Sequence, residues 1–376
     1  MNLVCDILRT REALLAARDE MAVLAEGQAH ASSIVQHPDW VLYEIESRDD
    51  GTVPHVVVAR NDAGAIVGYA PLLQARHVAR LDLAGRRLDL YKGMALRLLG
   101  SGVVTSPALR ASVSDAIAGQ LASERALRVL RIQEAMLPDP LAKALASHKG
   151  FRLVAAHLRE QVHWIIDPQP SSEAWLATLE KKKRTDLLQR VGRAYRKLGG
   201  DAALHRYTTP EQMPEYCRLL DEAYKRTWHH CDLPIDWQAP ARVALFQRLA
   251  RAGQVVGHIV LRERKPLAYV HGYRLGGTYL VEDLGYDEDV ARVGIGSVAV
   301  FQAIRGILDE HPGERISFGY GDNQYKRVLA TRSEPCGSLY AVRAGASTVG
   351  FHMYGPARWF YGNLRRLRER HAPSAL

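Results

Sequence analysis

A short polar segment near the C-terminal end of the chain holds three side chains that could take part in acyl transfer. Gly321–Lys326 places a carboxylate (Asp322), a phenol (Tyr325) and an ammonium group (Lys326) close together at the start of an expected short helix. Acyl transfer to an amine needs a base for the amine proton, an acid for the departing group and dipoles for the oxyanion. We predict that Tyr325 is the acid and Asp322 a base or substrate anchor. The competing interpretations are that Asp322 caps the helix and that Tyr325 packs as a core aromatic.

A glycine-containing loop upstream of this segment precedes a predicted helix. Glycines let the backbone approach an anion, and the free amides at a helix N-terminus attract negative charge. We predict that a pyrophosphate group binds here. The glycines also fit G-x-G-x-x-A, but charged residues precede them and no parallel βαβ series surrounds them, which disfavours a dinucleotide-binding fold. The predicted anion-binding residues are Arg292, Val293, Gly294, Ile295, Gly296 and Ser297.

Two adjacent carboxylates and a histidine lie on neighbouring predicted strands. Glu282 and Asp283 belong to Tyr279–Tyr286, and His271 belongs to Leu267–Arg274. Because side chains alternate along a strand, we expect one carboxylate to point inward and the other to the opposite face. One of the two carboxylates is a candidate general base, and His271 is a candidate for proton transfer. The alternatives are a solvated carboxylate and a hydrogen-bonded core histidine.

The elements that must position these residues recur in outline along the chain. Each half shows a hairpin, then a strand, a helix and another strand. Pro168–Ser172 combines two prolines with small polar residues and is the predicted linker. We therefore predict an N-terminal domain of residues 1–167, a C-terminal catalytic domain of residues 168–345, and a basic C-terminal helix within residues 346–376.

Composition is that of an ordinary folded protein. Of the 376 residues, 47% are hydrophobic and 24% are charged, which excludes disordered and repetitive classes. No uncharged apolar stretch approaches the roughly 18 residues that span a bilayer, so we predict a cytoplasmic protein without a membrane span. The four cysteines lack the paired spacing of metal or disulfide frameworks, and no metal is expected.

The formal net charge of +9 favours an anionic partner. Basic residues concentrate in one predicted helix, Ser172–Leu198, and again in the predicted C-terminal helix. A solvated basic face is the default interpretation of each. The first helix could instead dock a tRNA, an acidic carrier protein or an anionic polymer, and the second could contact a membrane surface peripherally.

Several common catalytic motifs are absent or isolated. Neither G-x-S-x-G nor G-x-x-x-x-G-K occurs, which removes the usual serine hydrolase and P-loop nucleotidase interpretations. H-x-x-x-D occurs at His163 and Asp167, but it lies on an apolar strand without surrounding motifs, so we assign it no catalytic role.

The segment Gly321–Lys326 resembles the G-D-x-x-Y-K signature of CelD-like GNAT acetyltransferases, a family related to the Fem-type aminoacyltransferases. The resemblance covers about residues 10 to 345. It implies an α/β (α+β) chain with two tandem GNAT-like domains, each a mixed central sheet flanked by helices. Further landmarks that agree with the family are Pro38 with Trp40, Pro71-Leu72, Lys182–Arg196 before Gly199-Gly200, Trp228, and Gly285-Tyr286-Asp287.

The resemblance also implies a reaction. Such an enzyme moves an acyl group from acetyl-CoA or another acyl-CoA to an amine or hydroxyl of a small-molecule or glycan acceptor, often in cell-surface polysaccharide or natural-product pathways. It places Asp322, Tyr325 and Lys326 at shared family positions and the pyrophosphate at Gly294–Ser297.

One departure from the GNAT pattern leaves the donor open. The GNAT loop usually begins with Arg or Gln three residues before its first glycine, where this chain has Ala291, followed by Arg292. An acyl carrier protein and a Fem-like aminoacyl-tRNA donor are therefore kept beside acyl-CoA, and a non-catalytic binding module is the remaining alternative.

Overall fold

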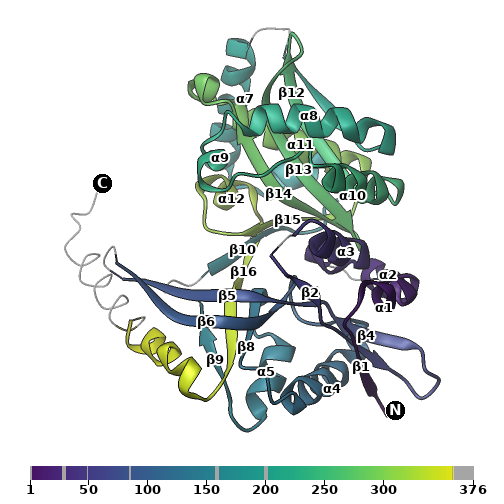
Figure 1. The fold of residues 1–376 in the computed structure, drawn as a ribbon. Coiled ribbons are helices and arrows are strands. Elements are labelled where there is room, and N and C mark those ends of the chain that lie inside the picture. The colour runs from purple at the N-terminus through teal and green to yellow at the C-terminus, as the bar shows by residue number, and fades with distance from the viewer. Residues whose placement is uncertain are drawn as a thin grey trace. The chain divides into compact units, whose positions relative to one another are not determined.

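The computed structural model describes residues 2–27, 31–48, 50–83, 86–156, 161–198, 202–357 and 359. Its internal contacts divide the chain into two compact units (Figure 1). Unit 1 comprises Met1–Gly27, Val35–Val162 and Pro335–Leu376, and unit 2 comprises Gln28–Ile34 and His163–Glu334. The chain therefore leaves unit 1 and later returns to it. The strand residues after Glu334, which the sequence analysis grouped with the second half, belong to unit 1.

Unit 1 is built on two sheets. Its strands are β1 (Val4–Leu8), β2 (Val53–Pro54), β3 (Val56–Arg60), β4 (Ile66–Ala70), β5 (Leu72–Leu83), β6 (Arg86–Leu98), β7 (Val104–Thr105), β8 (Val129–Met136), β9 (Phe151–Ala155) and the end of β16 (Arg332–Arg343). One sheet has the order β1-β3-β4-β7 and is antiparallel throughout. The other has the order β16-β8-β6-β5-β2, with β9 also paired to β16. In that sheet β6 and β8 run parallel, with Leu96 opposite Leu130.

Helices cover these sheets because their apolar side chains recur at helical spacing. Val113, Ile117 and Leu121 lie four residues apart on α4 and are all fully buried, in the same core as residues of β3, β5 and α5. The helical segments of this unit are α1 (Arg11–Ala16), α2 (Arg18–Glu26), α3 (Pro38–Glu46), η2 (Pro107–Leu109), α4 (Arg110–Ser123), α5 (Pro140–Ser147) and η5 (Ala346–Met353), and η1 (Ala31–Gln36) lies at a unit boundary.

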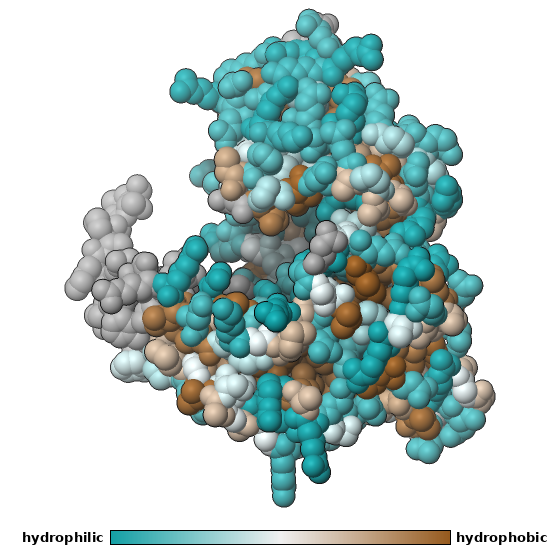
Figure 2. Space-filling view, in the orientation of Figure 1, coloured by the Kyte–Doolittle hydropathy of each residue, from teal (hydrophilic) through white to brown (hydrophobic). Residues whose placement is uncertain are grey.

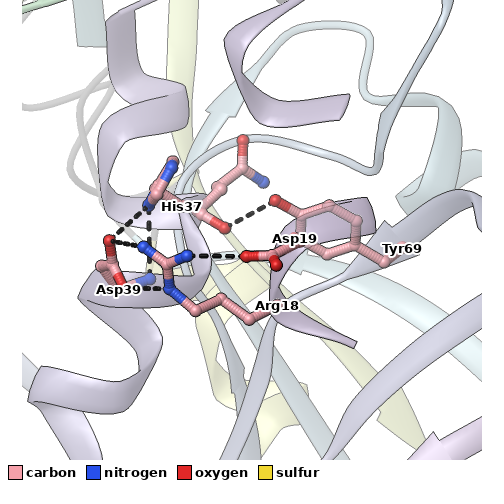
Figure 3. Close-up of polar contacts among 6 residues, drawn as sticks. Arg18, Asp19, His37, Asp39 and Tyr69 are labelled. Carbon is pink, nitrogen blue, oxygen red and sulfur yellow. Dashed lines mark hydrogen bonds and ion pairs between the residues drawn. The ribbon is translucent and has the colours of Figure 1, made fainter. Parts of the chain in front are cut away.

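An ion pair between the partly exposed Arg18 and the buried Asp39 joins α2 to α3 (Figure 3). The Arg18 guanidinium donates two hydrogen bonds to the carboxylate of Asp39, through Nε at 2.7 Å and Nη2 at 2.8 Å, and a third to Asp19. His37 lies on the other side of Asp39, and the Tyr69 hydroxyl donates to the Gln36 carbonyl at 2.9 Å. Each side chain in this cluster has a partner, so we interpret the cluster as a structural connection between helices.

Unit 2 is built on one mixed sheet. The strands are β10 (Gln161–Ile166), β11 (Ala202–Tyr207), β12 (Val255–Arg262), β13 (Lys265–Leu275), β14 (Thr278–Tyr286) and β15 (Arg315–Tyr320). Their order is β11-β12-β13-β14-β15-β10, antiparallel except for the parallel pair β14–β15.

Helices lie on both faces of this sheet (Figure 1). They are α6 (Ser172–Thr178), α7 (Lys181–Leu198), η3 (Pro210–Gln212), α8 (Met213–Tyr224), α9 (Trp228–Asp232), α10 (Pro240–Arg251), η4 (Glu288–Val293), α11 (Ile295–Glu310) and α12 (Gln324–Leu329). Helix α11 contacts β12, β13 and β14 and also packs against α6 and α7, whereas α8 and α10 pack on the sheet together. The prediction of a mixed α/β chain with helices flanking its sheets is confirmed.

Two predicted helices differ from the structure. The single helix expected over Ser172–Leu198 is interrupted between α6 and α7, where Leu179 takes an extended conformation (ψ 141°) and is buried. The C-terminal helix predicted from Tyr354 to His371 lies mostly outside the described residues. None of the described helices combines the length and hydrophobicity that crossing a bilayer would require.

The basic helix α7 has two distinct sides. Leu187, Val191, Ala194 and Leu198 are buried at helical spacing, while basic side chains occupy the exposed side. The exposed cations are Lys181, Lys182, Lys183, Arg190, Arg193, Arg196 and Lys197. Most of the surface in the view of Figure 2 is likewise hydrophilic, with hydrophobic residues in small groups.

Candidate active site

A pocket in unit 2 opens where two parallel strands separate. β14 and β15 are paired only from Thr278 opposite Arg315 to Leu280 opposite Ser317. Beyond that point no pairing joins the two strands, and a pocket of about 390 Å³ lies there. Its walls come from the second half of β14, the turn before α9 and the start of α12. The lining residues are Thr227, Trp228, His229, Val281, Glu282, Asp283, Leu284, Gly285, Tyr286, Phe318, Asn323, Gln324, Tyr325 and Lys326.

A β-bulge brings both acidic residues of β14 into this pocket. His271 on β13 pairs with Asp283, but the next residue, Gly272, pairs with Val281, so Glu282 is an extra residue in the strand. A bulge changes the alternation of side chains and redirects the residues beside it. Glu282 and Asp283 both line the pocket. The expectation that strand alternation sends them to opposite faces is therefore wrong, because the extra residue interrupts that alternation.

Glu282 has the electrostatic character of a general base. Its side chain is exposed on the pocket wall, and it makes no hydrogen bond or ion pair with any described residue. Surrounding protein atoms reduce the hydration of the carboxylate, and this effect, together with the charge of Asp283, raises the pKa of Glu282 to about 7. A carboxyl group with this pKa can accept a proton near neutral pH.

Asp283 is held by two residues that sequence reasoning did not select. The Tyr269 hydroxyl donates a hydrogen bond to Asp283 Oδ2 at 2.8 Å, and His229 Nδ1 lies 3.3 Å from Asp283 Oδ1. Tyr269 is two residues before His271 on β13, so strand periodicity could have indicated it, whereas nothing in the sequence indicated that His229 faces β14. Trp228, next to His229, is 57% exposed at the same pocket. Asp283 is thus held in a fixed position beside Glu282.

Tyr325 and Lys326, which the sequence analysis predicted to lie close together, both line the pocket. Their environments differ. Burial and the nearby Asp283 raise the pKa of Tyr325, so its hydroxyl stays protonated and can act as a proton donor. The ammonium group of Lys326 is buried and donates hydrogen bonds to the carbonyls of Phe318 at 2.6 Å and Tyr320 at 2.5 Å. Lys326 therefore fixes the end of β15 against α12, which is a positioning role.

Asp322 is not among the residues that line the pocket. Its carboxylate is exposed and accepts hydrogen bonds from the guanidinium of Arg327, including one from Nε at 2.6 Å. Arg327 lowers the pKa of Asp322, which weakens it as a base. The helix that follows has Asn323 at its N-cap and no side-chain capping bond, so Asp322 does not cap it either.

His271 lies in the core and does not reach the pocket. It is fully buried, and its two ring nitrogens lie 2.7 Å from the hydroxyl of Tyr216 and 2.8 Å from that of Tyr273. The ring stacks on Phe246, and burial lowers the pKa of His271 to about 3. These contacts correspond to the alternative of a hydrogen-bonded core histidine. The predicted role in proton transfer has no support in this geometry.

The glycine loop forms a helix start that suits an anion. Gly294 is the N-cap of the 16-residue helix α11 with φ of +84°, a conformation that favours glycine, and no side chain caps that end. A side chain at Gly296 would come within 2.6 Å of the Tyr286 ring. Ser297 and Val293 are partly buried, Ile295 is buried, and Arg292 is exposed next to the loop. Because Tyr286 also lines the pocket, the loop and the pocket are adjacent.

His163 and Asp167 do not form a catalytic pair. His163 is buried with its Nε2 atom 2.6 Å from the Ser317 hydroxyl, while Asp167 binds Arg332 and Thr331. The two side chains have separate partners, as expected for residues without a shared catalytic role.

Comparisons with known proteins agree with this geometry. Residues 181–327 match the family model described as an acetyltransferase (GNAT) domain. The chain carries a GNAT acyltransferase domain. Every residue that lines the pocket falls within the matched segment. The family assignment therefore applies to residues 181–327, and no curated protein sequence matches the chain.

Solved structures share the fold of this GNAT protein over nearly its whole length. FemX has a TM-score of 0.60 at 12% identity and covers 95% of this chain and 100% of its own. The C-terminal domain of a putative lysylphosphatidylglycerol synthetase from Agrobacterium fabrum has a TM-score of 0.56 at 13% identity, covering 91% and 96%. L-PGS from Bacillus licheniformis has a TM-score of 0.52 at 13% identity, covering 92% and 96%. At these identities the likeness shows a common fold.

Proposed function

We propose that this GNAT protein transfers an acyl group from an acyl thioester to an amine or hydroxyl acceptor in the unit 2 pocket, with Glu282 as general base. The observation that carries the proposal is the β-bulge. It places the carboxylate with a pKa of about 7 in the same pocket as a protonated tyrosine. We take the donor to be acetyl-CoA or another acyl-CoA, as the CelD-like resemblance implies, and the acceptor to be a small molecule or glycan.

The proposed reaction uses two proton transfers. Glu282 accepts the proton of the acceptor amine or hydroxyl as that atom attacks the thioester carbonyl and forms the new bond. The carbon–sulfur bond then breaks, and Tyr325 donates its hydroxyl proton to the departing thiolate. The products are an amide or ester and a free thiol. Tyr269 and His229 position Asp283, whose charge keeps Glu282 protonatable near neutral pH.

The glycine loop supports the proposal that the donor carries phosphate groups. No side chain caps the N-terminus of α11, and the helix dipole attracts anions to this end. The absence of side chains at Gly294 and Gly296 leaves the backbone accessible. Arg292 adds an exposed cation beside the loop. We assign the pyrophosphate of an acyl-CoA to this helix start.

Thermal unfolding in the presence of coenzyme A, acetyl-CoA and longer acyl-CoAs tests this assignment. A ligand at 100 times its Kd stabilises the folded state by about 2.7 kcal/mol, which raises the melting temperature measurably. Gly296→Ala should abolish the shift, because the new methyl group displaces Tyr286. The control is Gly306→Ala on the same helix, where a methyl group meets no atom within 4 Å and the ligand shift should persist.

A Fem-like reaction with an aminoacyl-tRNA donor is the second candidate. Two observations favour it: the FemX fold likeness and the row of exposed cations on α7. In that case the protein should copurify with tRNA, and its affinity for tRNA should fall steeply as salt rises. Reversing Arg190 and Arg193 to Glu should weaken tRNA binding, while reversing Arg251, a basic residue on α10, should not. A thermal shift with acyl-CoA and no binding of tRNA would exclude this candidate.

A further inference from the structure

Unit 1 contains a second pocket that the acyltransferase chemistry does not use. Its volume is about 250 Å³. It lies beside the parallel pair of β6 and β8, whose register runs from Leu96 opposite Leu130 to Leu98 opposite Ile132. The lining residues Met94 and Leu127 precede these paired segments in the chain. The pocket is therefore at the amino end of the parallel pair, whereas the unit 2 pocket is at the carboxyl end of its own pair.

Three polar side chains from separate segments meet in this pocket. Arg9 donates a hydrogen bond to Glu124 Oε2 at 3.1 Å, and its Nη1 lies 3.0 Å from Nδ1 of His55. His55 Nε2 lies 2.9 Å from Glu124 Oε1. Since Arg9 can only donate, His55 accepts at Nδ1 and donates from Nε2 to the carboxylate. Burial lowers the pKa of His55, so the imidazole is neutral and the cluster has one positive and one negative charge.

Both charges remain accessible from the pocket. The Arg9 side chain is 51% exposed and that of Glu124 is 19% exposed, whereas His55 is buried beneath them. A guanidinium has five N–H donors and a carboxylate about four lone-pair sites, so the contacts within the cluster use only part of their capacity. The Gln74 amide also lines the pocket and makes no hydrogen bond with any residue of the described ranges.

The remaining wall is apolar and incompletely covered. Met94 is 45% exposed at the pocket, and the largely buried Leu96 and Leu127 line the wall next to it. An exposed methionine beside a polar cluster is typical of a surface that binds an apolar group of a ligand. The volume is below the roughly 300–1,000 Å³ of pockets for drug-sized ligands, so the ligand has few heavy atoms.

We propose that this pocket binds an α-amino acid with an apolar side chain. The carboxylate of the ligand pairs with Arg9, the ammonium group with Glu124, and the side chain lies against Met94 and Leu127. A zwitterion matches a site with one charge of each sign about 3 Å apart. A polyphosphate such as the donor proposed for unit 2 would be repelled by Glu124. The inference does not depend on the reaction in unit 2.

Calorimetric titration of the full chain with small ligands tests the proposal. L-leucine and L-methionine should bind at micromolar to millimolar concentration. Two leucine analogues, 4-methylpentanoate without the ammonium group and 3-methylbutylamine without the carboxylate, should each bind at least tenfold more weakly. Equal affinity for leucine and either analogue, or no binding of leucine and methionine at millimolar concentration, would overturn the proposal.

Variants test whether Arg9 binds the carboxylate of the ligand and Glu124 its ammonium group. Glu124→Gln keeps an acceptor for His55 but removes the charge, so it should weaken leucine binding at least tenfold and leave 4-methylpentanoate unchanged. Arg9→Gln should weaken leucine and 4-methylpentanoate alike. The control is Arg11→Gln, which breaks the exposed ion pair with Glu46 outside the pocket and should change neither affinity. If leucine binding survives both Arg9→Gln and Glu124→Gln, the site is elsewhere and the proposal is wrong.

Discussion

Two carboxylate clusters, one in each unit, use the same side-chain types for different purposes. In unit 1, Asp39 is buried and accepts two hydrogen bonds from Arg18, with His37 beside it (Figure 3). In unit 2, Glu282 is next to another carboxylate, Asp283, and forms no ion pair with any residue the structure describes. The carboxylate of Asp39 thus has a fixed cationic partner, whereas the carboxylate of Glu282 has none among the described residues.

The difference supports the proposed role of Glu282 as general base. A carboxylate with a fixed guanidinium partner is stabilised in its charged form and is a poor base. A carboxylate that loses hydration beside a like charge has a pKa near neutrality, which suits proton transfer. Burial and a histidine neighbour are therefore insufficient to indicate function. The sign of the nearest charge distinguishes the two clusters.

Removing the charge of Glu282 should have the largest effect. Glu282→Gln keeps the size of the side chain but cannot accept the acceptor proton, so kcat/KM should fall by roughly 100- to 10,000-fold. The measurement is thiol release from an acyl-CoA with a panel of amine acceptors. Glu215→Gln, on the exposed side of α8, is the matched control and should retain full activity. Activity within threefold of the native protein would contradict the assignment of Glu282 as base.

Removing the charge of Asp39 should lower the stability of the protein and leave its catalytic constants unchanged. Asp39→Asn removes the two-pronged ionic partner of Arg18, which keeps its contact with the exposed Asp19. Because Arg18 is partly exposed and can be rehydrated, we expect the free energy of unfolding to fall by about 1–3 kcal/mol. Catalytic constants should stay unchanged where the protein is folded. Chemical denaturation and steady-state kinetics on the same sample measure both quantities. A fall in kcat without a loss of stability would mean that the cluster takes part in the reaction.

The two clusters should also differ in how stability responds to pH. Glu282 has a pKa of about 7 when folded, against 4.5 for an ordinary glutamate, so between these values the folded state binds the proton more tightly. Its contribution to stability therefore falls as pH rises through this window. Glu282→Gln should raise the melting temperature at pH 8 relative to native protein and not at pH 4.5. Solvent in the pocket limits the difference to about 1–3 °C.

Changing the neighbour of Glu282 should give the smallest effect. Asp283→Asn removes the second cause of the raised pKa, so the pH at which activity is half-maximal should move downward. Activity at high pH should change little, because Tyr269 can still donate to the asparagine oxygen. The pH dependence of kcat/KM measures the midpoint. A midpoint unchanged in Asp283→Asn would show that loss of hydration alone sets the pKa of Glu282.

The fold was predictable from the sequence where local patterns are strong. The strands β13 and β14 follow from apolar periodicity, and the structure has them within a few residues of the predicted bounds, Leu267–Arg274 and Tyr279–Tyr286. The interruption between α6 and α7 was not predictable, because Leu179 continues the apolar pattern of the helix although its backbone is extended. The return of the chain to unit 1 after Glu334 depends on long-range pairing that no local pattern reveals.

The site was predictable in part. Sequence reasoning identified Glu282, Asp283 and Tyr325, whose side chains line one pocket. It overestimated His271 and Asp322, because a residue type cannot reveal that two tyrosines or an arginine already bind it. It missed Tyr269 and His229, which act through contacts between distant segments.

Because of the extra residue in β14, the number of residues in this strand decides which side chains face the pocket. Along a regular strand, alternate side chains face opposite sides of the sheet. The bulge adds one residue, so the side chains that follow it face the side opposite to the one that regular alternation would give them. Deleting Val281 or another residue at that point would restore the regular phase, and one of the two carboxylates would turn away although both are still encoded. Alignment of related chains by residue identity alone would overlook such a loss. A gap of one residue in this strand is thus as informative about activity as a substitution of Glu282.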